Sequence, residues 1–150
     1  MLFRSLALLR QLQRPALLPL REGRGPRVHA VLVALGERQA TLQVGARQFV
    51  LPLEALDPVW QGDFSTFWRT PPGWRSGAGI DQGGASRAWQ QQWMARLEPG
   101  QQGRPWPDQV AAFQSRWGLP VDGLAGPLTL MQLNRGAGVE EPRLALAAQR

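Results

Sequence analysis

The chain has 150 residues, which fits one domain or two small ones. Its hydrophobic fraction of 43% and charged fraction of 19% exclude a chain that is disordered throughout. The formal charge of +6 comes from arginines scattered along the chain, without lysine and without the clustering on one helix face that a nucleic-acid footprint requires. Nucleic acid is therefore not an expected partner. Because the chain has no cysteine, disulfides, thiolate metal sites and thiol nucleophiles are excluded.

The first half of the chain is expected to be mainly antiparallel sheet. Residues 1–9 are apolar but short and lack a cleavage site, so we expect them to open a fold or to lie at the cut end of a longer chain. Leucines at helical spacing predict a short helix that ends before Pro15. The following apolar or alternating runs predict a β-meander with one helical turn at 52–56 and strands at 16–20, 28–35, 39–44, 48–53 and 64–69.

The second half is expected to be helical. Residues 70–79 are rich in Pro, Gly and Ser and predict a connection between domains. Apolar residues at helical spacing then predict helices at 85–97, 106–117 and 127–134. The expected fold class is therefore α+β, with a β-rich domain over residues 1–72 followed by a small three-helix bundle over residues 73–144.

The most specific motif of the sequence lies between residues 110 and 130. Gly118 can end the second helix in the left-handed conformation. Asp122-Gly123 predicts a turn in which glycine supplies a positive φ, and Pro127 suits the first turn of the last helix, where its missing N–H costs nothing. The glycines and the proline of the motif are therefore structural first.

This motif resembles the second half of the common peptidoglycan-binding domain. The family pattern has Phe-Gln on a helix, a Gly-Leu exit, Asp-Gly, and Gly-Pro-x-Thr at the start of the last helix. The resemblance implies a shallow groove beside the turn and the last helix, lined or shaped by Gln114, Trp117, Asp122, Gly123, Gly126 and Thr129. Asp122 and Thr129 can equally cap and brace the turn, and Trp117 can fill the core instead of stacking on a sugar.

The first half of the family repeat is present only in outline. Gly83-Gly84, Trp89 and Leu97 stand for its opening and its first helix. The usual first Asp-Gly turn is replaced by residues 98–103, Glu-Pro-Gly-Gln-Gln-Gly.

The β-rich half resembles the sheet half of the bacteriocin-processing, papain-like cysteine peptidases. His29 begins the central strand, where the family places its general base. A working site would also need a thiolate and an acid that orients the imidazole, but the chain has no cysteine and no Asp or Glu between Glu37 and Glu54. We therefore expect a degenerate peptidase fold that is not an enzyme and has no cofactor. A single histidine without recognisable ligand spacing also predicts no metal site.

The order of these parts resembles the periplasmic C-terminal region of the GspA/ExeA proteins of type II secretion. That resemblance implies a membrane-anchored parent protein in the periplasm that binds peptidoglycan and, with a GspB-type partner, assists assembly of the secretin. The chain has no phosphate-binding loop and no span of about 20 apolar residues, so we expect it to be the wall-binding portion alone or a truncated relative. Two alternatives are a wall-targeting accessory domain of a murein hydrolase or transpeptidase, and a protein-interaction domain without sugar binding. Homo-oligomers are possible in each case.

Overall fold

The computed structural model describes residues 2–75 and 85–145, so residues 76–79 of the expected connection and Gly83-Gly84 lie outside the described residues. Contacts divide the described chain into two compact units, residues 2–67 with 142–145 and residues 68–141. Residues 68–72, expected in the first domain, group with the helices because the Trp68 and Trp74 rings meet edge to face, 5.4 Å apart, beside the helical core. Residues 142–145 group with the sheet, where Leu144 joins the core.

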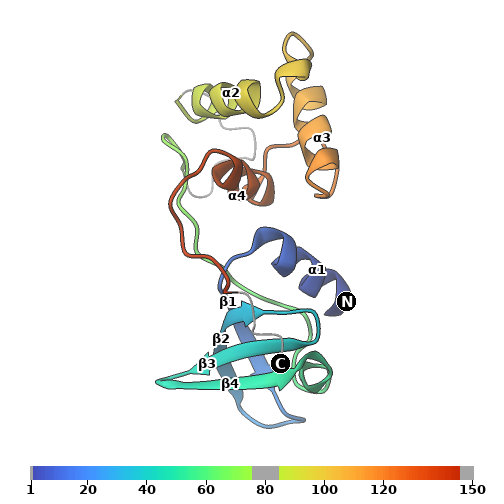
Figure 1. Ribbon diagram of the computed structural model, residues 1–150, viewed down its shortest axis with the longest axis vertical. Coiled ribbons are helices and arrows are strands. Elements are labelled where there is room, and N and C mark those ends of the chain that lie inside the picture. The colour runs from blue at the N-terminus through green and yellow to red at the C-terminus, as the bar shows by residue number, and fades with distance from the viewer. Residues whose placement is uncertain (1, 76–84, 146–150) are drawn as a thin grey trace. The chain divides into compact units, whose positions relative to one another are not determined.

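The first unit is a four-stranded antiparallel sheet in the order β1-β2-β3-β4, with one helix beside it (Figure 1). Its elements are α1 (Leu2–Leu12), β1 (Ala16–Arg21), β2 (Arg27–Leu35), β3 (Gln39–Val44), β4 (Arg47–Pro52) and a 3₁₀ turn, η1 (Leu53–Leu56). Alternate strand residues such as Leu18, Leu32 and Leu42 turn toward one face and are buried with Leu9 of α1. The predicted meander and the helical turn are confirmed.

The prediction of a strand at residues 64–69 is wrong. Only Ser65 pairs with the sheet, by two backbone hydrogen bonds to Leu17 of β1. The apolar pattern of this segment reflects two different surroundings instead of one strand face, since Phe67 is 90% exposed whereas Trp68 packs against the helical core.

The second unit contains three helices around a small apolar core. They are α2 (Ala85–Leu97), α3 (Trp106–Arg116) and α4 (Pro127–Gly136), with a 3₁₀ turn, η2 (Pro99–Gln101), after α2. Met94, Phe113 and Leu130 bring one buried side chain from each helix into this core. The predicted α+β fold class and the predicted helices are thus confirmed.

Glycines end two of these helices. Gly118 follows α3 with φ +63°, its N–H donates to the Ser115 carbonyl, and the Leu119 N–H donates to the Gln114 carbonyl. After α4, Gly138 has φ +72° and its N–H donates to the Arg135 carbonyl, while the Val139 N–H donates to the Asn134 carbonyl. Both are Schellman ends, which satisfy the last carbonyls of a helix.

Candidate functional site

The turn between α3 and α4 is built around the side-chain amide of Gln114. This residue of α3 is only 2% exposed. Its Nε2 donates toward Asp122 Oδ1 at 2.7 Å, the Leu124 carbonyl at 3.0 Å and Thr129 Oγ1 at 3.0 Å. One buried amide therefore joins α3, the turn and the first residues of α4.

The carbonyl oxygen of the same side chain completes the turn. Gln114 Oε1 accepts from the backbone N–H groups of Asp122 at 3.0 Å and Gly123 at 2.9 Å. Gly123 has φ +72°, and a Cβ added there would lie 3.2 Å from the carbonyl oxygen of Pro107. The sequence-based interpretation of Asp122-Gly123 as a turn with positive φ is confirmed, and the close approach of Pro107 adds a second reason for glycine.

The Asp122 carboxylate is stabilised in its charged form. The hydrogen bond from the Gln114 side chain, and then that from the Leu124 N–H, hold the pKa of Asp122 below its ordinary value, against a smaller opposing effect of desolvation. Because its folded-state pKa is lowered, Asp122 stabilises the fold fully above the unfolded-state pKa of about 4. This contribution is lost as the pH falls through the lowered pKa.

Asp122→Asn is expected to flatten the acid limb of the stability curve. The amide oxygen of asparagine can still accept from Gln114 and Leu124, but it does not titrate. The midpoint of urea unfolding, measured from pH 6 down to about pH 2, should fall less steeply below pH 4 in the variant than in the wild type. Equal slopes in the two proteins would show that the Asp122 carboxylate is not stabilised by folding.

The six residues predicted to line or shape a groove divide by exposure. Gln114 and Thr129 are buried, so they can support a groove but cannot touch a polymer from outside. Trp117 is half-buried against the core, with its ring centroid 5.7 Å from that of Phe113. Asp122 is exposed, and Gly123 and Gly126 are half-buried at the surface of the turn.

A hollow of about 490 Å³ lies in the same unit at the carboxyl end of α4, whereas the Gln114-braced turn lies before its amino end. Trp89 of α2 and Asn134 of α4 line it from the helices. The rest of its lining comes from two chain segments, residues 69–72 and 137–140. We call this hollow the α4 groove.

A buried amide also holds the walls of the α4 groove together. Asn134 is 1% exposed, and its Nδ2 donates to the Arg69 carbonyl at 2.7 Å and to Glu141 Oε1 at 3.1 Å. Glu141 Oε1 accepts in addition from the Arg69 N–H at 2.8 Å. The two segments are therefore fixed to each other and to α4, so the groove is preformed.

Sequence reasoning missed the α4 groove because its walls come from residues that appeared to be a linker and a trailing segment. Arg69 and Asn134 are 65 residues apart, and no spacing rule connects them. The available signal was the composition of residues 69–74, where Pro71, Pro72 and Trp74 are suited to a rigid wall and not to a flexible connection.

Residues 98–103, which stand in place of the usual first Asp-Gly turn, are held by their own contacts. Glu98 is buried, and its Oε2 pairs with Arg116 Nη1 of α3 at 3.1 Å. Gly103, with φ +83°, closes the turn after η2. An ion pair and a glycine thus connect α2 to α3 without an Asp-Gly sequence.

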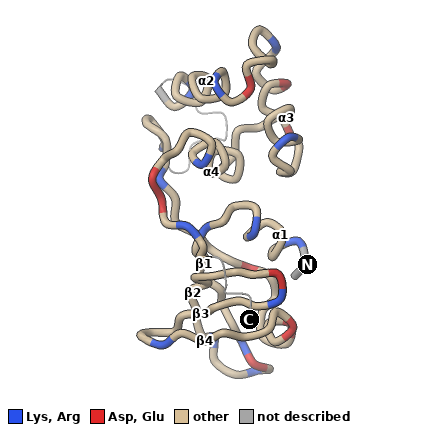
Figure 2. Tube along the Cα trace, in the orientation of Figure 1, with Lys and Arg blue, Asp and Glu red and all other residues tan. Residues whose placement is uncertain are grey.

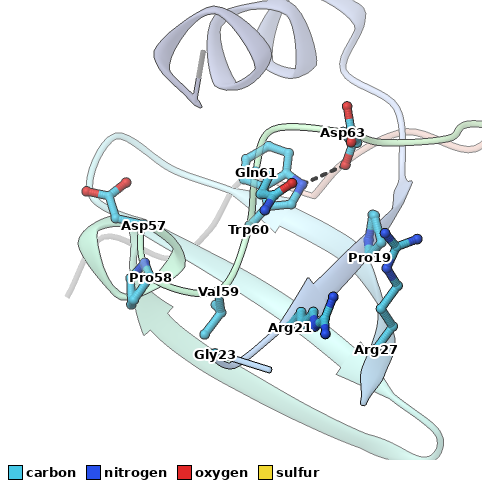
Figure 3. A pocket seen from close by; sticks show the side chains of 10 residues that line it. All are labelled: Pro19, Arg21, Gly23, Arg27, Asp57, Pro58, Val59, Trp60, Gln61 and Asp63. Carbon is cyan, nitrogen blue, oxygen red and sulfur yellow. Dashed lines mark hydrogen bonds between the residues drawn. The ribbon is translucent and has the colours of Figure 1, made fainter. Parts of the chain in front are cut away.

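The sheet unit places its histidine on the open face of the sheet. His29 of β2 is exposed and pairs in register with Pro19 of β1. Within residues 2–75 and 85–145 no three His, Asp or Glu side chains cluster as a metal site would require. The sheet unit also has a hollow, whose lining includes Arg21, Arg27, residues 57–61 and Asp63 (Figure 3).

Arginines are dispersed over helices, strands and loops of both units (Figure 2). In the described part of the chain, none of the helices combines the length and the apolar character that crossing a membrane requires.

Comparison with a solved structure shows which fold the chain shares. No family model matches the chain. A periplasmic domain of the EpsAB fusion protein of the Vibrio vulnificus type II secretion system, known from its crystal structure, matches with a TM-score of 0.53. The match covers 89% of this chain and 62% of that one at 24% identity, so it shows a shared fold.

A particular relative is found by sequence. The chain is 33% identical over 152 aligned residues to General secretion pathway protein A of Aeromonas hydrophila. The match covers 97% of this chain, but the chain spans only 28% of the length of that relative. The predicted resemblance to the C-terminal region of the GspA/ExeA proteins is confirmed.

Proposed function

We propose that the chain is a noncatalytic peptidoglycan-binding module that acts in the periplasm and assists assembly of a type II secretion system. The observation that carries this proposal is the 33% identity to General secretion pathway protein A across 97% of the chain. The secretin and a GspB-type protein are the proposed partners, in a parent protein anchored in the inner membrane. The fold shared with a periplasmic domain of the EpsAB fusion supports this setting.

A noncatalytic role agrees with the chemistry that the sequence provides. Without cysteine the peptidase-like half has no thiol nucleophile, and one exposed histidine does not activate a substrate without an orienting acid. The proposed activity is therefore binding alone.

We assign the contact with peptidoglycan to the α4 groove, with the Gln114-braced turn as the support of the helix that lines it. The groove presents one aromatic face, Trp89, beside the exposed polar side chains of Thr70 and Glu140. An aromatic ring flanked by hydrogen-bonding groups suits a sugar, which has an apolar face and a rim of hydroxyls. A volume of about 490 Å³ is within the range of small-ligand sites.

A titration with soluble muropeptides tests this assignment. The ¹⁵N-labelled chain would be titrated with the disaccharide–tetrapeptide released from sacculi, and the shifted resonances mapped. We expect the largest saturable shifts at the Trp89 indole, at the amides of Arg69 and Thr70, and in residues 137–140. Shifts confined to Asp122 and Gly123 would move the site to the turn. The absence of saturable shifts would favour a protein-interaction domain without sugar binding.

A further inference from the structure

The sheet unit contains a hollow of about 320 Å³ that the proposed function does not use (Figure 3). Arg21 at the end of β1 and Arg27 at the start of β2 line one side of it. Residues 57–61 and Asp63, which follow η1, also line it, and the Arg21 N–H donates to the Val59 carbonyl at 2.7 Å. We call this hollow the hairpin pocket.

Two like charges face each other in the hairpin pocket. Arg21 and Arg27 are direct partners in the β1–β2 register, so their side chains leave the same face of the sheet. Side chains at such positions start about 5 Å apart, and like charges placed there destabilise the sheet. An anion bound between them would remove that repulsion.

The two arginines differ in how they are held. The Arg21 Nε donates to the Gly25 carbonyl at 3.0 Å, and its Nη2 donates to the Arg24 carbonyl at 3.3 Å, so the guanidinium is fixed over the turn. Arg27 makes no such side-chain bond to any residue that the structure describes. The Arg21 guanidinium is therefore preorganised, whereas the Arg27 side chain can rotate to contact a ligand.

No carboxylate of the described chain forms an ion pair with Arg21 or Arg27. Asp57 and Asp63 line the same pocket, but neither forms an ion pair with Arg21 or Arg27 among the described residues. Figure 3 shows Asp57 across the pocket from the two arginines, with Trp60 and Gln61 between them.

We propose that the hairpin pocket binds a carboxylate of a peptide, with Arg21 and Arg27 as the cationic pair that holds it. Two guanidinium groups can donate parallel hydrogen bonds to the two oxygens of a carboxylate. A phosphate group carries a charge between about −1.5 and −2, which Asp57 and Asp63 would repel more strongly than the single charge of a carboxylate. The small volume limits the ligand to one side chain and its neighbouring backbone.

The test is an NMR titration of the ¹⁵N-labelled chain with acetyl-Ala-Glu-Ala-amide at constant ionic strength. The matched probe is acetyl-Ala-Gln-Ala-amide, which has the same shape without the charge. We expect the glutamate peptide alone to give saturable shifts at the Trp60 indole and at Gln61. Equal shifts with both peptides would overturn the proposal, as would tighter binding of inorganic phosphate at the same site.

Arg27→Gln is expected to weaken binding of the glutamate peptide about tenfold, the loss typical of a hydrogen bond to a charged group. Arg47→Gln is the matched control because Arg47 is also an exposed arginine at the end of a hairpin, paired with Val44. The control should bind like the wild type. If both variants weaken binding equally, the attraction is the net charge of the chain and the pocket has no specific role.

Discussion

Gln114→Ala is expected to lower the free energy of unfolding of the helical unit by about 3 kcal/mol or more. The substitution removes the buried amide that joins Asp122, Leu124 and Thr129, and it leaves the N–H groups of Asp122 and Gly123 without their acceptor. Each buried polar group that loses its partner costs about 1–3 kcal/mol. Tryptophan fluorescence during urea unfolding measures the change, because every tryptophan except Trp60 lies in this unit.

Gln109→Ala is the matched control on the same helix. Its Nε2 makes one exposed bond, to the Arg104 carbonyl at 2.7 Å, so the loss should stay below about 1 kcal/mol. A third variant, Gln114→Glu, replaces the donating amide by an acceptor facing Asp122 Oδ1 and should be at least as destabilising as alanine. If Gln114→Ala and Gln109→Ala have equal effects, the amide does not hold the turn together.

Trp89→Leu is expected to weaken binding to peptidoglycan about tenfold or more while the fold is retained. Leucine keeps an apolar group at the edge of the helical core but removes the flat aromatic face in the α4 groove. Shortening a tryptophan that anchors an interface commonly lowers the binding free energy by about 2 kcal/mol or more. Depletion of the variant from solution by increasing amounts of sacculi measures the affinity.

Trp93→Leu controls for the loss of a tryptophan from the same helix. Trp93 is also half-buried against the core, but the Arg96 guanidinium lies over its ring at 4.9 Å, and it does not line the α4 groove. The two variants should lose similar stability, and only Trp89→Leu should lose affinity. Equal affinities would remove the α4 groove from the proposed site.

The elements of this fold were largely predictable because short-range rules decide them. Alternation in β3 and helical spacing in α2 gave the observed bounds, since each element buries one regular face. The left-handed glycines after α3 and in the turn were predictable for the same reason, because few other residues adopt that conformation.

The geometry of the turn and of the two proposed sites depends on contacts between residues far apart in the sequence, which rules about neighbouring residues do not predict. That Gln114 is the centre of the turn follows from bonds to residues 8 to 15 positions away. The α4 groove depends on Asn134 closing on Arg69, and the hairpin pocket on the register that pairs Arg21 with Arg27. A family resemblance indicated the turn, but it could not indicate a groove built by segments outside its pattern.

The central claim, that this chain binds peptidoglycan, is tested most directly by cosedimentation of the whole chain with purified sacculi. Cellulose serves as the control polymer. Both polymers are tested at salt concentrations of roughly 0.05 M and 0.5 M, at which electrostatic attraction is weakly and strongly screened. We predict that the chain pellets with sacculi at both concentrations and stays in solution with cellulose. Pelleting that disappears at high salt, or that is equal with cellulose, would contradict specific binding of the wall.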